Sequence, residues 1–312
     1  MTQLADDAPI VASRSVGGGL LLAVASATSF GLSGPLAAGL LANGWSPGAI
    51  VLARIGLAAI GLAPFTLASL RGRWGQLRGQ LTRLLVYGVL AVAGAQFCYF
   101  SAVAKMDVGP ALLIEYTAPA AVVGWLWLRH GQRPRLLTVF GAVLAALGLV
   151  LVLNLVSGAH LAWSGVAWAL AAMVGATAYF LISADTGTGL PPLSLAGIGL
   201  MIGAAVLALL AVAGILPMHA GTASVAFAPG TVAWWVPLLL LGLVTAAFAY
   251  VMGIAASRLL GSRVASFVAL LEVVAAVCFA WLLVDQLPGW SQLAGGLLII
   301  AGVVAVKLGD RR

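Results

Sequence analysis

The stretch ALLIEYTAPAAVVGWLWLRHGQRP, residues 111–134, combines the features that decide the fold. Most of it is apolar, and about 20 such residues in a helix cross the roughly 30 Å hydrocarbon core of a membrane. Glu115 and Pro119 interrupt the apolar run, and three arginines follow it within residues 128–135. The stretch predicts a transmembrane helix that contains an ionisable group and a bend and ends at a charged face of the membrane.

The rest of the chain repeats this pattern. Hydrophobic residues make up 63% of the 312, charged residues only 7%, and the mean hydropathy is +1.14, which leaves too little polar surface for a soluble globule. The runs are continuously apolar rather than alternating, which favours helices over barrel strands. The sequence predicts an all-α membrane protein with ten spans near residues 18–41, 48–69, 84–104, 109–128, 136–156, 163–184, 193–216, 232–254, 264–284 and 291–307.

The basic residues predict the orientation of these spans. If both termini are cytoplasmic, thirteen Lys or Arg residues fall on the inside and only Lys105 falls outside, as the positive-inside rule requires. The net charge of +7 is then explained by orientation, and no nucleic-acid partner is needed. We expect a multi-pass protein of the inner (plasma) membrane of a bacterium, with cytoplasmic tails at 1–17 and 308–312 and a first span that is retained rather than cleaved.

An internal repeat divides the chain. A shift of 154 residues places 102–153 on 256–307 without a gap, and 13 of these 52 positions are identical, including Trp127 with Trp281 and Pro134 with Pro288. Each half, 18–156 and 163–307, would hold five spans. Five is odd, so the second half would enter the membrane from the opposite side, which is the inverted repeat of many secondary transporters.

The same residues resemble the EamA-type repeats of the drug/metabolite transporter superfamily over nearly the whole chain. That pattern has a Tyr near the end of the third helix, a Glu-Pro-like step in the fourth and paired glycines in the fifth. The matching positions are Tyr99, Ala118-Pro119, Gly141 and Gly148 in the first half, and Tyr250, Glu272-Val273, Gly295 and Gly302 in the second. Each half keeps one member of the Glu-Pro pair. The stretch IEYTAP looks most similar to the threonine/homoserine exporter branch, which implies amino-acid export.

Three charged side chains lie deep in the predicted spans, and each costs at least about 2.5–3.5 kcal/mol to insert. Arg54 and Glu115 both lie roughly 9 Å from the outer ends of their helices, so they could form a static ion pair. Alternatively, Arg54 receives a solute carboxylate while Glu115 takes an ammonium group or a coupling proton. Glu272 lies about 12 Å deep from the inside, with no basic residue at that depth in helices six to ten. It is the candidate for proton coupling, and a structural hydrogen bond is the alternative.

Other polar and aromatic residues recur at helical spacing and could line a cavity for a small solute. The candidate substrate-binding residues are Arg54, Glu115, Gln96, Tyr99, Tyr116, Trp168, Tyr179 and Tyr250. Gly34, Pro35 and Pro119 weaken the helical hydrogen bonding and could mark gating bends or ordinary packed kinks.

The sequence thus predicts a secondary active transporter that exports small metabolites such as amino acids by alternating access, with proton antiport as a coupling mode. Efflux of cationic or aromatic drug-like compounds and uptake of a metabolite remain alternatives, as does a membrane-embedded enzyme or scaffold. No histidine lies deep in a span and no phosphate-binding loop is present, so we expect no catalytic residues, metal or cofactor. The expected partners are a small-molecule substrate, lipid and protons; the oligomeric state is left open.

Overall fold

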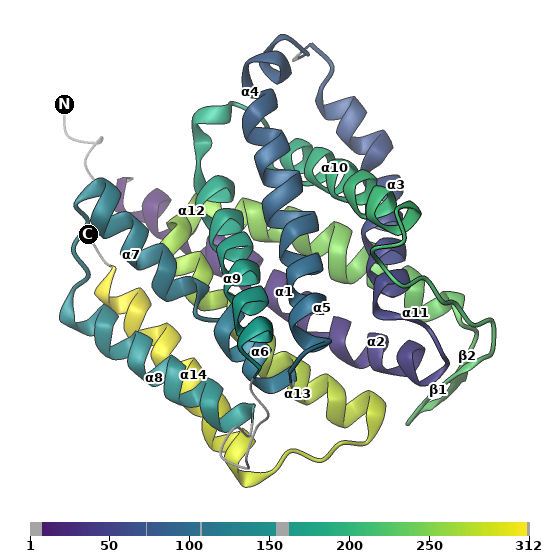
Figure 1. Cartoon of the computed structure of the whole chain (residues 1–312). Helices are drawn as coiled ribbons and strands as arrows, with labels where there is room; N and C mark the ends of the chain where they lie inside the picture. The colour runs from purple at the N-terminus through teal and green to yellow at the C-terminus, as the bar shows by residue number, and fades with distance from the viewer. Residues whose placement is uncertain (1–7, 73, 107, 154–161, 311–312) are drawn as a thin grey trace, which may run out of the picture.

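The computed structural model is a helical bundle and describes residues 8–72, 74–106, 108–153 and 162–310 (Figure 1). The helices of the amino-terminal part are α1 (Ala8–Gly31), α2 (Ser33–Ala42), α3 (Pro47–Ser69), α4 (Trp74–Val86), the π-helix η1 (Tyr87–Gly94), α5 (Ala95–Val103), α6 (Val108–Glu115), α7 (Ala118–His130) and α8 (Leu136–Val152). The remainder contains α9 (Trp163–Ala184), the 3₁₀ turn η3 (Thr186–Thr188), α10 (Pro192–Val212), β1 (Val225–Phe227), β2 (Gly230–Val232), α11 (Trp235–Leu239), the π-helix η4 (Leu240–Phe248), α12 (Ala249–Ala269), α13 (Leu271–Val284) and α14 (Trp290–Gly309).

Within the described residues, eight helical stretches are long and apolar enough to cross a membrane, and Leu136–Val152 and Leu271–Val284 are shorter apolar helices. They occupy the regions of the ten expected spans, and the count of ten stays a prediction. The span expected at 264–284 is divided at Leu270: α12 is interrupted by the non-helical Gly261, with φ of 78°, its last segment ends at Ala269, and α13 begins at Leu271. The span expected at 109–128 is likewise divided, with α6 ending at Glu115 and α7 beginning at Ala118.

A short β-hairpin, which the sequence did not predict, occupies part of the connection between α10 and α11. Val225 pairs with Val232 in antiparallel register. The segment that contains it is held by the turn between α2 and α3: the Asn43 amide donates to the carbonyls of Ala223 and Ser224 at 3.1 and 2.8 Å, and the Trp45 indole N–H donates to that of Gly221 at 2.7 Å. We call this end of the bundle the hairpin face.

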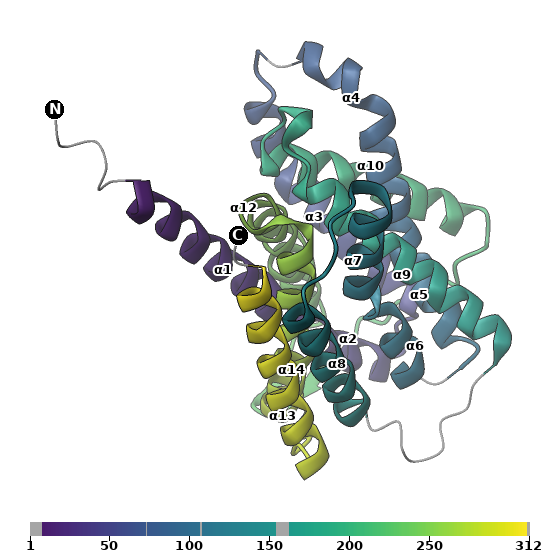
Figure 2. The ribbon, with the colours of Figure 1, turned by 90° about the vertical axis from the view of Figure 1, so that its left-hand side faces the viewer.

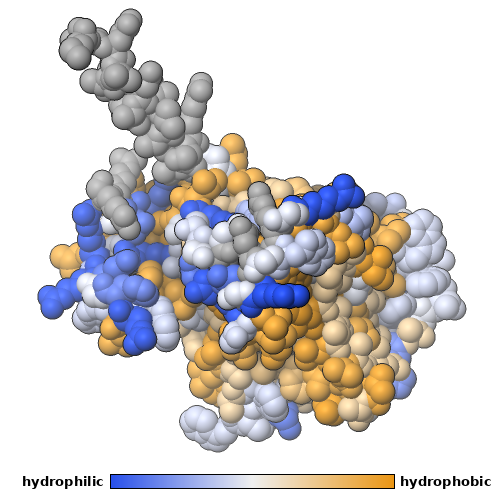
Figure 3. All heavy atoms as spheres, turned by 90° about the horizontal axis from the view of Figure 1, so that it is seen from above, coloured by the Kyte–Doolittle hydropathy of each residue, from blue (hydrophilic) through white to orange (hydrophobic). Residues whose placement is uncertain are grey.

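Arginine side chains join several loops at the opposite end, which we call the arginine face. Arg83 pairs with Asp185 at 2.9 Å, and Arg263 pairs with Asp310 at 2.9 Å. Arg258 donates from Nη1 to the carbonyl of Leu190. Seen from above, hydrophilic residues gather in patches beside a broad hydrophobic surface (Figure 3). Asp185 therefore supplies the carboxylate that balances Arg83 in a loop that carries no basic residue of its own.

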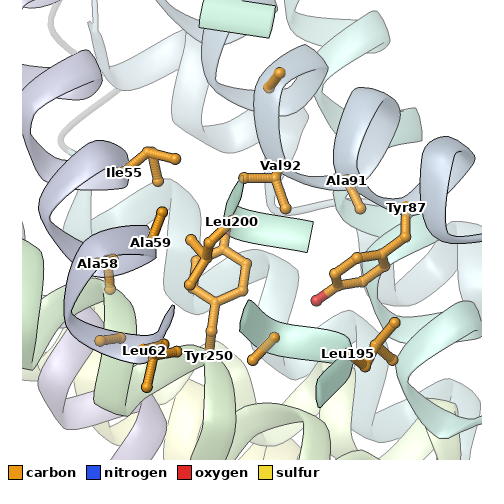
Figure 4. Packing of buried hydrophobic residues seen from close by; sticks show 14 of the residues in the cluster. Ile55, Ala58, Ala59, Leu62, Tyr87, Ala91, Val92, Leu195, Leu200 and Tyr250 are labelled. Atoms are coloured by element: carbon orange, nitrogen blue, oxygen red, sulfur yellow. The ribbon is translucent and has the colours of Figure 1, made fainter. Parts of the chain in front are cut away.

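The largest buried cluster connects α3, η1, α10 and α12. Figure 4 shows Ile55, Tyr87, Leu195, Leu200 and Tyr250 packed together in it. The tyrosine rings of Tyr87 and Tyr250 are 0% and 4% exposed, although each carries a hydroxyl group. This cluster extends along α3 and α10 as far as Leu216, which lies against Gly48 at the start of α3.

Positions 154 residues apart share unusual backbone conformations. The π-helix Tyr87–Gly94 corresponds to Leu240–Phe248, and the interruption after Glu115 corresponds to the one at Leu270. Gly131, with φ of 67°, corresponds to Asp285, the one described non-glycine residue with positive φ, at 56°. A left-handed conformation is costly for a residue with a Cβ, so its retention at Asp285 reflects the same helix-ending geometry in both halves.

The helices α8 and α14 pack closely along glycines, and Figures 1 and 2 both show them side by side. A Cβ built on Gly141 would lie 2.6 Å from the carbonyl oxygen of Gly302, and one on Gly302 would lie 2.6 Å from that of Gly141. Gly148 and Gly295 make the same reciprocal contact at 2.6 Å. Because the partner number falls as the residue number rises, the two helices run antiparallel. Small residues allow this backbone approach in membranes.

We predict that Gly148→Ala destabilises the protein by about 1–3 kcal/mol, because the added methyl group would force α8 and α14 apart. The unfolding midpoint in an SDS titration of the purified protein measures this effect. Gly124→Ala on α7 is the matched control, since a Cβ there meets nothing within 4 Å. Equal midpoints for the two variants would contradict the close-packing account.

Candidate functional site

A cavity of about 520 Å³ lies between the helices of the two halves. Its wall includes residues at the hairpin-face ends of α2, α3 and α5, namely Leu41, Pro47 and Val103, and no residue of the arginine-bearing loops. The cavity therefore opens toward the hairpin face, and the buried cluster that contains Tyr87 and Tyr250 closes it on the other side.

Arg54 is the cation of the cavity and is only 9% exposed. Its Nη2 donates to the Thr245 carbonyl at 2.8 Å, and its guanidinium carbon lies 5.7 Å from the centroid of the Phe30 ring. Its Nε is buried and has no hydrogen-bond partner. Buried charged groups need such contacts, and an unused Nε–H leaves one donor for a further acceptor.

Glu272 lies at the start of α13 and interacts electrostatically with Arg54. The Tyr116 hydroxyl also interacts with its carboxylate. The end of α1 packs against this turn, since a Cβ on Gly31 would lie 2.7 Å from the Glu272 carbonyl oxygen. The sequence analysis compared Glu272 with basic residues of helices six to ten alone, and Arg54 lies outside that set because it comes from α3.

Glu115, at the end of α6, also lines the cavity and interacts electrostatically with Glu272. Among the described residues, Arg54 and Glu115 do not form an ion pair, so the proposed static bridge between them is absent. Equal depth in the membrane did not bring them together because Arg54 is directed toward Phe30 and the Thr245 carbonyl, on α1 and η4.

Aromatic rings form a continuous series from the cavity toward the arginine face. Phe30 contacts Tyr250 edge to face with centroids 5.4 Å apart, and Tyr250 contacts Tyr179 at 5.5 Å. Tyr179 then lies 6.1 Å from Tyr87. The first two pairs are edge to face and the third is tilted, with 30° between the ring planes. Edge-to-face pairs are favourable beyond their buried area, so the series forms a firm floor under the cavity.

The other predicted residues divide into two groups. Gln96, Tyr99, Tyr116, Gly34 and Pro119 are in the cavity wall, together with Tyr179 and Tyr250. Trp168 is not: its ring packs edge to face on Phe97 at 5.6 Å, in a cluster with Ala102 and Met106. Trp168 shares a helical face with Tyr179, but it lies eleven residues before Tyr179 on α9, which is too far along the helix to reach the cavity.

The predicted bends fall at helix ends. Helix α1 stops at Gly31 and α2 starts at Ser33, just before the buried Pro35. Pro119 occupies the first turn of α7, where its missing N–H costs nothing. Both interruptions border the cavity.

Sequence reasoning missed several wall residues, of which Phe30 matters most. Phe30 lies one turn after Ser26, whose hydroxyl donates to the Ala249 carbonyl at 2.8 Å. Ser26, Ser29 and Ser33 recur at helical spacing in the first span, and this polar face could have indicated Phe30. Ser257 and Ser266 of α12 also line the wall, and their sequence neighbourhood gives no comparable signal. Within the described part of the chain, no group of three His, Cys, Asp or Glu residues is arranged to hold a metal.

The chain belongs to the EamA-like transporter family: the family model matches residues 17–154 and again residues 163–308. It is therefore a multi-pass membrane transporter with two EamA repeats. A solved crystal structure of a protein shares 22% identity with it at a TM-score of 0.70, over 97% of this chain and 99% of the other, which shows a common fold. No curated protein matches the sequence.

We predict that a double-mutant cycle couples Arg54 to Glu272 more strongly than to Glu115. Neighbouring residues show coupling energies of about 0.5–3 kcal/mol, and the Arg54→Gln/Glu272→Gln pair should fall in this range. The Arg54→Gln/Glu115→Gln pair is the control and should stay below about 0.5 kcal/mol. Thermal unfolding of the purified variants supplies the values, and a larger coupling to Glu115 would contradict the geometry described above.

Proposed function

We propose that this EamA-like transporter carries a small amino-acid-like solute through the cavity by alternating access. The observation that carries the proposal is one cavity holding a buried cation, Arg54, and two carboxylates, Glu115 and Glu272, between two repeats. Transporter sites of this architecture lie near the bilayer midplane at the repeat interface.

The charges match a zwitterion. The free Nε–H of Arg54 can donate to a solute carboxylate, and Arg54 is already oriented by the Thr245 carbonyl. Glu115, which has no ion pair with Arg54, is then the acceptor for the ammonium group. Rings such as Tyr99 and Phe100 give the remaining wall its apolar character, so the solute side chain can be apolar or aromatic.

The two repeats, 18–156 and 163–307, are proposed to be inverted. Gly141 and Gly148 are equivalent by sequence to Gly295 and Gly302, yet Gly141 contacts Gly302 and Gly148 contacts Gly295. A two-fold axis between the repeats produces such crossed contacts. The axis exchanges Gly141 with Gly295 and Gly148 with Gly302, so the contact of Gly141 with Gly302 becomes the contact of Gly295 with Gly148. This supports ten spans with repeats of opposite orientation.

The arginine face is assigned to the cytoplasm of a bacterial cell by the positive-inside rule, together with both tails, 1–17 and 308–312. The cavity as described then opens to the outside, and export is the proposed direction of transport. The second conformation would close the hairpin face and open the arginine face.

Glu272 is proposed to couple transport to proton antiport. Its carboxylate interacts electrostatically with Arg54, and its backbone packs against Gly31 at the end of α1. A change in the charge of Glu272 would therefore affect both the solute site and the bend between α1 and α2. A carboxylate that exchanges a proton for a solute needs such a link.

A cationic aromatic compound is the second candidate solute. The cavity wall holds two carboxylates and one guanidinium, which leaves one excess negative charge when all three are ionised, and aromatic faces attract cations. In this case Arg54 would be a structural partner of Glu272 instead of a carboxylate receptor.

Counterflow in proteoliposomes distinguishes the candidates. We expect labelled neutral amino acids with apolar or aromatic side chains to exchange, and Arg54→Gln to reduce exchange at least tenfold while the protein still folds. Exchange of a cationic dye that Arg54→Gln does not reduce would favour the second candidate. If no solute of either class moves, the proposal is wrong.

Glu272→Gln should remove the stimulation of transport by a pH gradient and keep solute exchange. The neutral amide has nearly the shape of the acid but cannot bind and release a proton during transport. Glu115→Gln is the matched comparison and should weaken solute exchange itself. Transport by Glu272→Gln that still follows the pH gradient would exclude this residue as the proton carrier.

A further inference from the structure

A second polar cluster lies below the cavity, on its arginine-face side, and only its Tyr179 is among the candidate solute-binding residues named above. It consists of Tyr87 of η1, Tyr179 and Ser183 of α9, and Arg258 of α12. The rings of Tyr87 and Tyr179 lie 6.1 Å apart, and Tyr87 interacts with both Ser183 and Arg258. We call these four residues the lower cluster.

The lower cluster holds donors that have no acceptors. The Tyr179 hydroxyl and the Nε and Nη2 of Arg258 are buried without a hydrogen-bond partner, and the buried hydroxyls of Tyr87 and Ser183 have only each other. Tyr87 and Ser183 are 0% exposed, and Figure 4 shows the Tyr87 hydroxyl directed into the packed interior. Buried polar groups in native proteins are nearly always paired, so a set of unpaired donors this dense requires an explanation.

The charge of the lower cluster is positive. Arg258 uses only Nη1, in its bond to the Leu190 carbonyl. Asp185 is the acid that acts on Arg258 electrostatically, but it is already in an ion pair with Arg83 at 2.9 Å. One carboxylate for two arginines leaves an excess cation beside three hydroxyls, which is the donor set that an anion prefers.

The repeat indicates when this cluster meets solvent. Leu241 lines the cavity in this conformation, whereas its equivalent 154 residues earlier, Tyr87, does not. Inverted repeats exchange conformations when a transporter changes sides, so Tyr87 should line the cavity of the other state. Ser257, the equivalent of Val103, already lines the present cavity, and Arg258 directly follows it.

From these observations we propose that the lower cluster is a second binding site, for the carboxylate group of a solute, which forms when the arginine face opens. The site would take the anion from that side and pass it along the tyrosine series to Arg54. The proposal rests on the alternating-access function proposed above, and it adds a site with its own ligand chemistry.

The test places a cysteine in the cluster. Ser183→Cys is made with Cys98 and Cys278 replaced by serine, and the purified protein is treated with an anionic or a cationic methanethiosulfonate. We expect the anionic reagent to react about tenfold faster, because a local positive charge concentrates anions. Arg258→Gln should remove this preference. Ser33→Cys, on the cavity wall at the start of α2, is the control, and Arg258→Gln should leave its reactivity unchanged.

Added ligands identify the anion. Sodium benzoate should protect Ser183→Cys in a saturable way, and benzamide, its neutral analogue, should not. Equal protection by sodium phosphate would show a site for inorganic anions and overturn the carboxylate assignment. A cysteine at 183 that never reacts, or that reacts equally with both reagents, would overturn the site. If the cysteine at 183 fails this test but the same protein still exchanges solute, the proposed transport function stands and only the second site is overturned. If the protein without the Ser183→Cys substitution exchanges no solute, both the transport function and the second site are overturned.

Discussion

The buried charge of Arg54 has to be stabilised by groups on other helices, because an apolar bundle offers its guanidinium no water. Its contacts are the Thr245 carbonyl and the ring of Phe30, and its electrostatic partner is Glu272. Phe30 belongs to the first repeat, whereas Thr245 and Glu272 belong to the second. Satisfying one buried charge therefore fixes the helices around the cavity from both halves.

The irregular helices serve the same purpose. Thr245 lies in the π-helix η4, whose carbonyls are displaced from regular α-helical geometry, and π-helical turns are frequent at functional sites. Glu115 ends one helix and Glu272 begins another, so both acids lie where the helical repeat is broken. Interruptions at charged residues also provide places where a half-helix can move without unfolding.

Much of the fold could be predicted because a membrane restricts the choice of structure. Apolar run length predicted the helices, and the 154-residue offset found in the sequence also relates the two π-helices and the two helix breaks that the structure shows. Sequence alone placed Arg54, Glu115 and Glu272 in one protein interior, but it could not pair them. Helix depth is one coordinate, and rotation about the helix axis, which turned Arg54 away from Glu115, depends on packing. The β-hairpin was missed because three-residue strands carry little periodicity.

The central claim is that the hairpin and arginine faces open in alternation around the cavity. Electron paramagnetic resonance distances between spin labels test it most directly, with one pair at Leu41 and Val103 and another at the exposed Leu85 and Leu259. With Cys98 and Cys278 replaced, solute should change the two distance distributions in opposite directions. Distances that stay fixed at both faces, or that lengthen together, would contradict alternating access.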